Sequence, residues 1–231
     1  PREGAMRYRL QDGWKTYASV KELANRDRIL DILEKVYGRV PIPFQTLNFK
    51  YGTQQSAHSD RIHFSSLPEG FMCGVWVALE DVSPDNGTLF YLKDSHREQD
   101  WKNHDIKWDY QSFHYSAYQR FMAAYQEEVG SEKITFEAKK GDALIWSSKL
   151  IHGGSPVRKP GSTRWSQVTH YFFEDCIYLT PQFSDMIAGE YFLRSLTNIK
   201  TGEPVEHRFN GAKVETFPTD RPNRFRIQVQ S

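Results

Sequence analysis

Residues 71–92, FMCGVWVALEDVSPDNGTLFYL, contain two apolar runs separated by a segment rich in turn formers. The runs FMCGVWVALE (71–80) and TLFYL (88–92) are rich in β-branched and aromatic residues, which favour strands. The segment SPDNG (83–87) between them consists of residues that are typical of turns. The stretch predicts a β-hairpin with a loop longer than the two-residue minimum.

Further strands are predicted on both sides of this hairpin. Residues 44–51 (FQTLNFKY) alternate in polarity, so Thr46 and Asn48 are expected on one face and Leu47 and Phe49 on the other. Three more strands are predicted at residues 133–138, 143–147 and 164–173. The residues KKGD (139–142) predict a tight turn between two of them.

Helices are predicted toward the ends of the strand-rich region. Residues 18–36 place apolar side chains at helical spacing, and Ser19 with Glu22 forms a capping-box pattern at their start. The remaining expectations are a helix at 116–129, a short helix at 185–196 and a long loop at 97–115. Many short strands with helices at the edges indicate an all-β sandwich or barrel with peripheral helices, and a jelly roll is one such fold.

The length of 231 residues suits one domain, which we expect to span 1–231 with a core at about 44–173 and a C-terminal extension at 181–231. Lys and Arg number 30 and Asp and Glu 29, so the formal net charge of +1 gives no electrostatic case for binding nucleic acid. Two cysteines, Cys73 and Cys176, lie in apolar runs and are expected to be buried thiols.

Apolar runs in the chain are all shorter than the ~20 residues that a membrane-spanning helix requires. The N-terminal residues do not show the charged-then-apolar pattern of a secretory leader. We therefore expect a cytoplasmic protein that does not insert into a membrane.

Three residues form a candidate metal site. His58 and Asp60 are two positions apart, a spacing that places both side chains on one face of a strand. His152 follows a separate strand pattern and supplies a second imidazole. Two histidines and one carboxylate can hold an octahedral iron(II) on one side and leave three positions open. A surface histidine hydrogen-bonded to a nearby carboxylate would also explain the tripeptide. The choice between these two interpretations depends on the residues around it.

Arg164 stands twelve residues after His152, and Ser166 shares its face of the predicted strand. A guanidinium grips a carboxylate through two parallel hydrogen bonds, and a hydroxyl can add a third. Such an anchor suits the far end of a dicarboxylate that chelates iron through a keto-acid group. The alternative for Arg164 is an ordinary surface ion pair.

The order of motifs resembles that of the phytanoyl-CoA dioxygenase family, which belongs to the iron(II)/2-oxoglutarate oxygenases. The chain reads HSD (58–60), then VWVALEDV, NGTLFYL and SH, then KKGDALIW and a histidine, then RWS (164–166). The resemblance covers roughly residues 44 to 173. It implies a double-stranded β-helix (jelly roll), with His58, Asp60 and His152 as iron ligands and Arg164 as the 2-oxoglutarate anchor.

The resemblance also suggests positions around the co-substrate. Trp76 is expected to form a wall of its pocket, although plain core packing would equally explain a tryptophan there. Thr46 and Asn48 lie on the strand from which the family often contacts the co-substrate, and Gln55 is an alternative for this role. His170, on the Arg164 face of its strand, is either a support for the metal site or a satisfied core histidine.

The resemblance implies an Fe(II)-dependent dioxygenase that uses 2-oxoglutarate and O2, hydroxylates a small to medium organic substrate, and releases succinate and CO2. Asp60 argues against halogenation, because relatives that halogenate replace this acid with a small residue. Two alternatives stay open. A cupin-like metal enzyme without 2-oxoglutarate would usually add a third histidine and needs no distal arginine. A non-catalytic jelly-roll binding protein would commonly lose a ligand or the anchor.

Overall fold

The computed structural model describes residues 9–97 and 115–229 of the chain. Five antiparallel strands form the larger sheet, in the order β1-β2-β9-β4-β7. Their bounds are β1 (Arg9–Gln11), β2 (Pro41–Phe49), β4 (Met72–Ala78), β7 (Ala143–Ser147) and β9 (Ser166–Phe173). Every residue of β4 and β9 is buried, which accounts for the continuous apolar sequence of β4, whereas β9 buries polar side chains as well.

A second sheet of three strands faces the first. Its order is β6-β5-β8, with β5 (Leu89–Leu92), β6 (Lys133–Phe136) and β8 (His152–Gly154). The chain crosses between the sheets from β4 to β5, from β6 to β7, and again before and after β8. Trp76, Leu89 and Val168 from both sheets pack in one apolar cluster. This arrangement is the predicted jelly roll.

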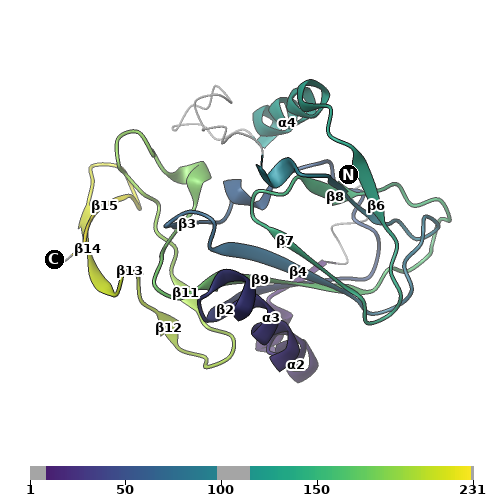
Figure 1. Cartoon of the computed structure of the whole chain (residues 1–231), viewed down its shortest axis with the longest axis horizontal. Coiled ribbons are helices and arrows are strands. Elements are labelled where there is room, and N and C mark those ends of the chain that lie inside the picture. The colour runs from purple at the N-terminus through teal and green to yellow at the C-terminus, as the bar shows by residue number, and fades with distance from the viewer. Residues whose placement is uncertain (1–8, 98–114, 230–231) are drawn as a thin grey trace.

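Helices cover the outer faces of the two sheets (Figure 1). The helix α3 (Asp27–Tyr37), which follows α2 (Ala18–Ala24), packs Leu33 against Val75 of the larger sheet. The helix α4 (Tyr115–Val129) packs Tyr118 and Met122 against Phe90 of the smaller sheet. The predicted helix at 116–129 is thus confirmed, whereas the loop predicted at 97–115 lies almost wholly outside the described residues.

The single helix predicted at 18–36 is wrong, because the chain forms two helices with a break at Asn25 and Arg26. Asn25 leaves helical geometry, and its side-chain amide donates to the Lys21 carbonyl at 2.8 Å. Asparagine competes in this way with the backbone hydrogen bonds of a helix. Ser19 does not cap the helix either, since the N-cap residue is Tyr17.

The C-terminal part forms short strands rather than the helix predicted at 185–196. Asp185 accepts a hydrogen bond from the Ala188 amide at 3.0 Å, and Gly189 takes a left-handed φ of 66°. The resulting turn pairs Asp185 with Glu190 and excludes a helix. The strands are β11 (Leu196–Thr197), β12 (Pro204–Val205), β13 (Arg208–Phe209), β14 (Ala212–Pro218) and β15 (Phe225–Val229).

Two short strands, β3 (Ser65–Leu67) and β10 (Ile177–Leu179), pair antiparallel near the start of this extension. The sheet β13-β14-β15 lies at the left of Figure 1, on the opposite side of the molecule from β6. Four 3-10 turns complete the described elements: η1 (Gly13–Lys15), η2 (Asp60–Ile62), η3 (Ser95–Arg97) and η4 (Pro181–Phe183).

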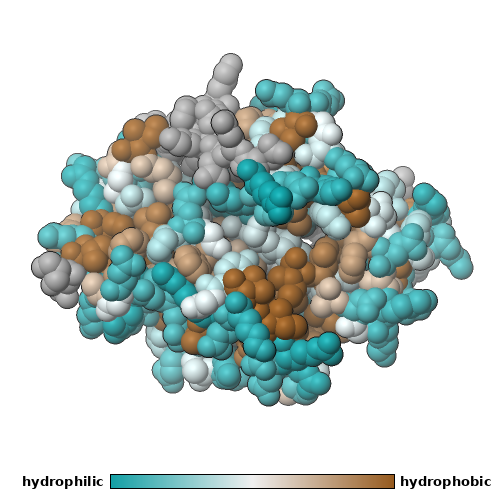
Figure 2. Space-filling model, viewed as in Figure 1, coloured by the Kyte–Doolittle hydropathy of each residue, from teal (hydrophilic) through white to brown (hydrophobic). Residues whose placement is uncertain are grey.

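Burial in the described residues agrees with one further expectation from the sequence. Cys73 and Cys176 are free and buried, as predicted. Polar residues cover most of the face shown in Figure 2, and apolar side chains gather in patches between them. None of the helices in the described ranges is long and apolar enough to cross a membrane.

Candidate metal centre

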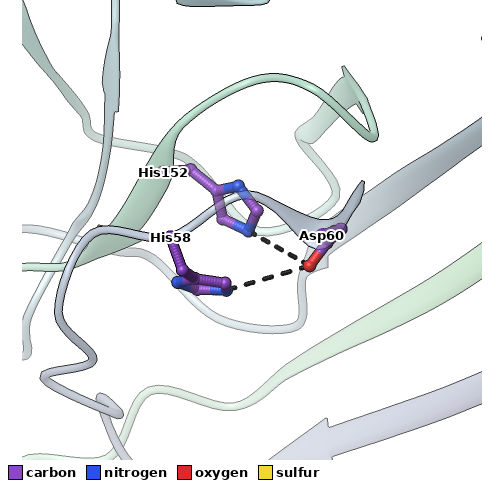
Figure 3. A group of neighbouring side chains, drawn as sticks. All are labelled: His58, Asp60 and His152. Carbon is purple, nitrogen blue, oxygen red and sulfur yellow. Dashed lines mark ion pairs between the residues drawn. The ribbon is translucent and has the colours of Figure 1, made fainter. Parts of the chain in front are cut away.

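Three buried side chains converge between the two sheets. The Nε2 atom of His58 lies 3.8 Å from Asp60 Oδ1, and the Nε2 atom of His152 lies 3.9 Å from the same oxygen. Figure 3 shows both imidazoles pointing toward this carboxylate. Ligand atoms of the three residues all lie within 4.8 Å of one another. Because metal–nitrogen and metal–oxygen bonds are about 2.0–2.2 Å long, one ion fits between them.

Backbone pairing sets the positions of the two histidines. The His58 amide donates to the His152 carbonyl and the His152 amide donates to the His58 carbonyl, both at 2.9 Å. This isolated antiparallel bridge places the imidazole centroids 4.5 Å apart. Asp60 comes from the first residue of η2 and not from a strand, so a turn brings it to the histidines where the sequence had suggested strand alternation.

Hydrogen bonds orient both imidazoles so that Nε2 is available to a metal. The Nδ1 atom of His58 lies 3.0 Å from the Ser56 carbonyl, and that of His152 lies 3.0 Å from the Leu150 carbonyl. A carbonyl only accepts, so each Nδ1 carries a proton, and Nε2 is the ring nitrogen directed at the metal site. Burial, together with the neighbouring His152, lowers the pKa of His58 to about 4, which leaves it neutral at pH 7.

The second oxygen of Asp60 is held by the protein. The Trp146 indole N–H donates to Asp60 Oδ2 at 2.8 Å, and His170 Nε2 lies 3.7 Å from the same atom. Burial opposes ionisation of Asp60, but the neighbouring His152 and His170 hold its pKa well below the usual range. The carboxylate is therefore ionised, with Oδ1 directed at the histidines.

Trp146 was missed by reasoning from the sequence. In ALIWS it reads as an ordinary core residue of β7, and the spacing does not link it to Asp60. The glycine opposite offers a signal, because Gly74 pairs with Trp146 across the sheet and a Cβ there would lie 2.6 Å from the indole ring. A glycine inside a buried strand often marks such a close approach.

A cavity of about 640 Å³ adjoins the three residues. His58, Asp60 and His152 line it, and so do Arg164 and Trp76 from the larger-sheet region. Residues of the C-terminal extension close another side of it: Gln182, Phe183, Phe192 and Arg194. The cavity therefore joins the metal cluster to both the jelly-roll core and the extension.

Arg164 is almost completely buried in the wall of this cavity, at 1% exposure. Its Nη1 donates to the Gly87 carbonyl at 3.1 Å, its Nε has no partner, and it forms no ion pair within the described residues. Burial lowers its pKa to about 10, so the guanidinium is still charged at pH 7. A buried charge without a counter-ion is costly, so this wall favours an anionic ligand.

Two of the other positions singled out in the sequence lie on the cavity and one lies beside it. Trp76 has its ring 5.9 Å from the Arg164 guanidinium, and its indole N–H has no partner in the described chain. Gln55 is exposed, and its Nε2 lies 3.3 Å from His58 Nε2. Ser166 is buried on β9 without a partner for its hydroxyl, but it does not line the cavity.

The structure does not bring Thr46 and Asn48 to the cavity. The side chains of β2 that line it are those of Gln45, Leu47 and Phe49, on the opposite face of the strand. Asn48 donates to the Gln167 side-chain carbonyl at 3.0 Å, on the side covered by the N-terminal segment. The alternation expected from the sequence is present, but its polar face points away from the metal cluster.

The family model for phytanoyl-CoA dioxygenase (PhyH) matches residues 18–165, which is more than half of the chain. The chain belongs to the phytanoyl-CoA dioxygenase family. Human peroxisomal phytanoyl-CoA dioxygenase is 26% identical over 131 residues, covering 56% of this chain and 37% of the human protein. The probable phytanoyl-CoA dioxygenase of Caenorhabditis elegans is 25% identical over 133 residues, covering 57% and 41%. The chain thus aligns with less than half the length of these relatives.

Solved structures share the fold of this family member. The non-heme alpha ketoglutarate dependent epimerase SnoN from nogalamycin biosynthesis has a TM-score of 0.60 and 18% identity, covering 95% of this chain and 76% of SnoN. EctD from S. alaskensis, solved with 2-oxoglutarate and 5-hydroxyectoine, has a TM-score of 0.54 and 17% identity, covering 72% and 56%. At these identities the likeness concerns the fold alone.

Proposed function

We propose that this chain is an iron(II)- and 2-oxoglutarate-dependent dioxygenase that oxidises a small organic molecule. The observation that carries the proposal is the uncompensated Arg164 guanidinium in the cavity of the His58, Asp60 and His152 cluster. A metal cluster alone would suit many enzymes, but a buried anion anchor beside it suits a dicarboxylate co-substrate. Family membership and the co-substrates named for SnoN and EctD support the same reading.

The three cluster residues would hold the ion from one side. His58 and His152 present their Nε2 atoms and Asp60 presents an ionised oxygen, a set of two imidazoles and one carboxylate that suits non-haem iron(II). When bound, the iron supplies the activation of O2, coupled to conversion of 2-oxoglutarate into succinate and CO2. The Trp146 hydrogen bond keeps the second Asp60 oxygen on the protein and so fixes the rotation of the carboxylate.

Arg164 would bind the distal carboxylate of 2-oxoglutarate. Its Nη1 is fixed by the Gly87 carbonyl and its Nε is buried, so its Nη2 remains to donate to a ligand in the cavity. Trp76 lies beside the guanidinium and limits the access of water to that end. Exclusion of water strengthens the charge-assisted hydrogen bonds of the anchor. The formal net charge of +1 agrees with a small-molecule substrate rather than a nucleic acid.

The test uses the anaerobic protein with iron(II) and 2-oxoglutarate, observed in the visible range for the weak charge-transfer band of a keto acid chelated to iron. We expect the band in the parent protein, its loss in His152→Ala, and its weakening in Arg164→Ala. Arg26→Ala, an exposed arginine paired with Glu22, is the matched control and should keep the full band.

Other outcomes would overturn the proposal in different ways. Normal iron binding without a band would remove 2-oxoglutarate from the reaction and favour a cupin-like metal enzyme. No iron binding at all would contradict the ligand set and favour a non-catalytic jelly-roll binding protein.

A further inference from the structure

A second arginine, Arg194, lines the same cavity as Arg164. It comes from the C-terminal extension, outside the residues 18–165 that match the family model. Its Nη1 donates to the Thr180 hydroxyl at 2.8 Å and to the His63 carbonyl at 3.4 Å. Its Nε is buried without a hydrogen-bond partner, and among the described residues it forms no ion pair. The extension therefore adds a second uncompensated cation to the cavity.

The Arg194 guanidinium is held in a fixed orientation. Its central carbon lies 4.6 Å from the Phe64 ring centroid and 5.9 Å from that of Phe44. Burial lowers its pKa to about 10 and the more distant Asp12 acts against this shift, so it is charged at pH 7. Because Nη1 is bonded to the protein and Nε is buried, Nη2 is the nitrogen that remains to donate to a ligand. A carboxylate there would receive a charge-assisted hydrogen bond.

Arg194 lies close to the metal cluster but at a different end from Arg164. The Phe64 ring beside Arg194 lies 5.0 Å from the His170 ring, and His170 in turn lies 3.7 Å from Asp60. Arg164 instead precedes the first residue of β9, whereas His170 lies well along that strand. His170 and Arg164 are six residues apart along the chain, so Arg194 lies near a different part of β9 from Arg164, which lies beside Trp76.

We propose that Arg194 binds the carboxylate of the substrate, which is an organic acid with an apolar body. The inference rests on the proposed function, in which 2-oxoglutarate occupies Arg164 and leaves Arg194 for a different ligand. The apolar body would contact Phe64, Phe183 and Phe192, which line this end of the cavity. A partly buried cation flanked by aromatic rings favours a carboxylate over the corresponding alcohol, because only the carboxylate compensates the charge.

The test measures binding, not turnover. Protein loaded with manganese(II) and saturated with N-oxalylglycine, an inert 2-oxoglutarate analogue, is titrated calorimetrically with phenylacetate and separately with phenylethanol. We expect phenylacetate to bind at least about tenfold more tightly, since a charge-assisted pair contributes ~1.5–3 kcal/mol and 1.4 kcal/mol is tenfold. Arg194→Gln should remove this difference while leaving phenylethanol binding unchanged, and Arg194→Lys should retain part of it.

Arg208→Gln is the matched control, because Arg208 lies on the same extension, is paired with Glu206 and does not line the cavity. Melting temperatures of all variants check that they are folded. Equal affinity for the two probes in the parent, or unchanged phenylacetate affinity in Arg194→Gln, would overturn the assignment. The assignment would also be overturned if phenylacetate competed with N-oxalylglycine and lost its affinity in Arg164→Gln, because it would then bind at Arg164. Failure to bind manganese(II) or N-oxalylglycine would instead contradict the proposed function.

Discussion

At the scale of single residues, the two oxygens of Asp60 have different surroundings. Oδ1 faces His58 and His152, whereas Oδ2 is bonded to the Trp146 indole and faces His170. A carboxylate that can rotate freely would lose entropy on binding a metal. One whose second oxygen is already hydrogen-bonded loses less, and it presents the ligand oxygen in one direction. We therefore expect Trp146 to position Asp60 for binding the metal.

Trp146→Phe tests this role. The substitution keeps an aromatic ring in the core but removes the hydrogen bond to Asp60, so we expect manganese(II) affinity to fall by about 10- to 100-fold. Isothermal titration measures the affinity, and circular dichroism shows whether the fold is kept. Trp14→Phe is the control, because the Trp14 indole N–H has no hydrogen-bond partner in the described chain and does not line the cavity. An affinity equal to that of the parent would show that the indole only fills space.

The residues of the site differ in how visible they are in the sequence. His58 and Asp60 lie in one tripeptide, and Arg164 follows His152 by twelve residues. Their residue types and the order of the motifs therefore both identified them as candidates. Trp146 has no such pattern, because its role depends on which strand pairs with β4. A contact of this kind is set by tertiary structure and is not encoded in local spacing.

At the scale of elements, α4 is connected directly to the metal-binding segment. The Tyr118 hydroxyl accepts a hydrogen bond from the Ser59 amide at 2.8 Å and donates to the Ser59 carbonyl at 3.1 Å. Ser59 is buried and lies between His58 and Asp60. One phenol thus satisfies both backbone groups of the residue that joins the two ligands.

Tyr118→Phe should loosen this segment. Two buried backbone groups would lose their partner, at a cost of about 1–3 kcal/mol for each group that stays unsatisfied. We expect a lower melting temperature together with weaker manganese(II) binding. Met122→Leu, on the same buried side of α4, conserves volume and should change stability by less than about 1.5 kcal/mol with normal metal affinity. Lower stability with unchanged metal affinity in Tyr118→Phe would separate α4 from the site.

The strand β2 shows what a period-two pattern leaves open. The sequence predicts that Thr46 and Asn48 share a face, and they do, but the inward face is that of Leu47 and Phe49. Alternation defines two faces without saying which one meets the cavity. A one-residue shift exchanges them, and β2 has such a register irregularity between Pro43 and Gln45.

At the scale of the whole molecule, the cavity is built from parts that differ in predictability. The jelly roll followed from the order of motifs, and the structure confirms it. The extension did not follow, because the turn at Asp185 interrupts the helical pattern of residues 185–196 and most of its strands are very short, although FRIQV in β15 does alternate. Arg194 belongs to this part, and no motif in the sequence singles it out. The jelly roll, which contains the residues proposed to bind the metal and 2-oxoglutarate, was thus easier to predict than the extension, which contains the residue proposed to bind the substrate.

Ligand binding should stabilise the whole fold in two separable steps. A ligand that binds only the native state adds about 2.7 kcal/mol at 100 times its dissociation constant. For a domain of this size, ~2–4 °C per kcal/mol corresponds to a rise in melting temperature of about 5–10 °C for each step. Manganese(II) should give the first rise in melting temperature and N-oxalylglycine the second. N-oxalylglycine alone should give little, because it chelates the metal as well as contacting Arg164.

In His152→Ala both rises in melting temperature should shrink, whereas in Arg164→Ala the first should remain and only the second should be lost. Loss of both rises in Arg164→Ala would mean that the arginine supports the metal cluster itself, and the two ends of the cavity would then have to be treated as one site.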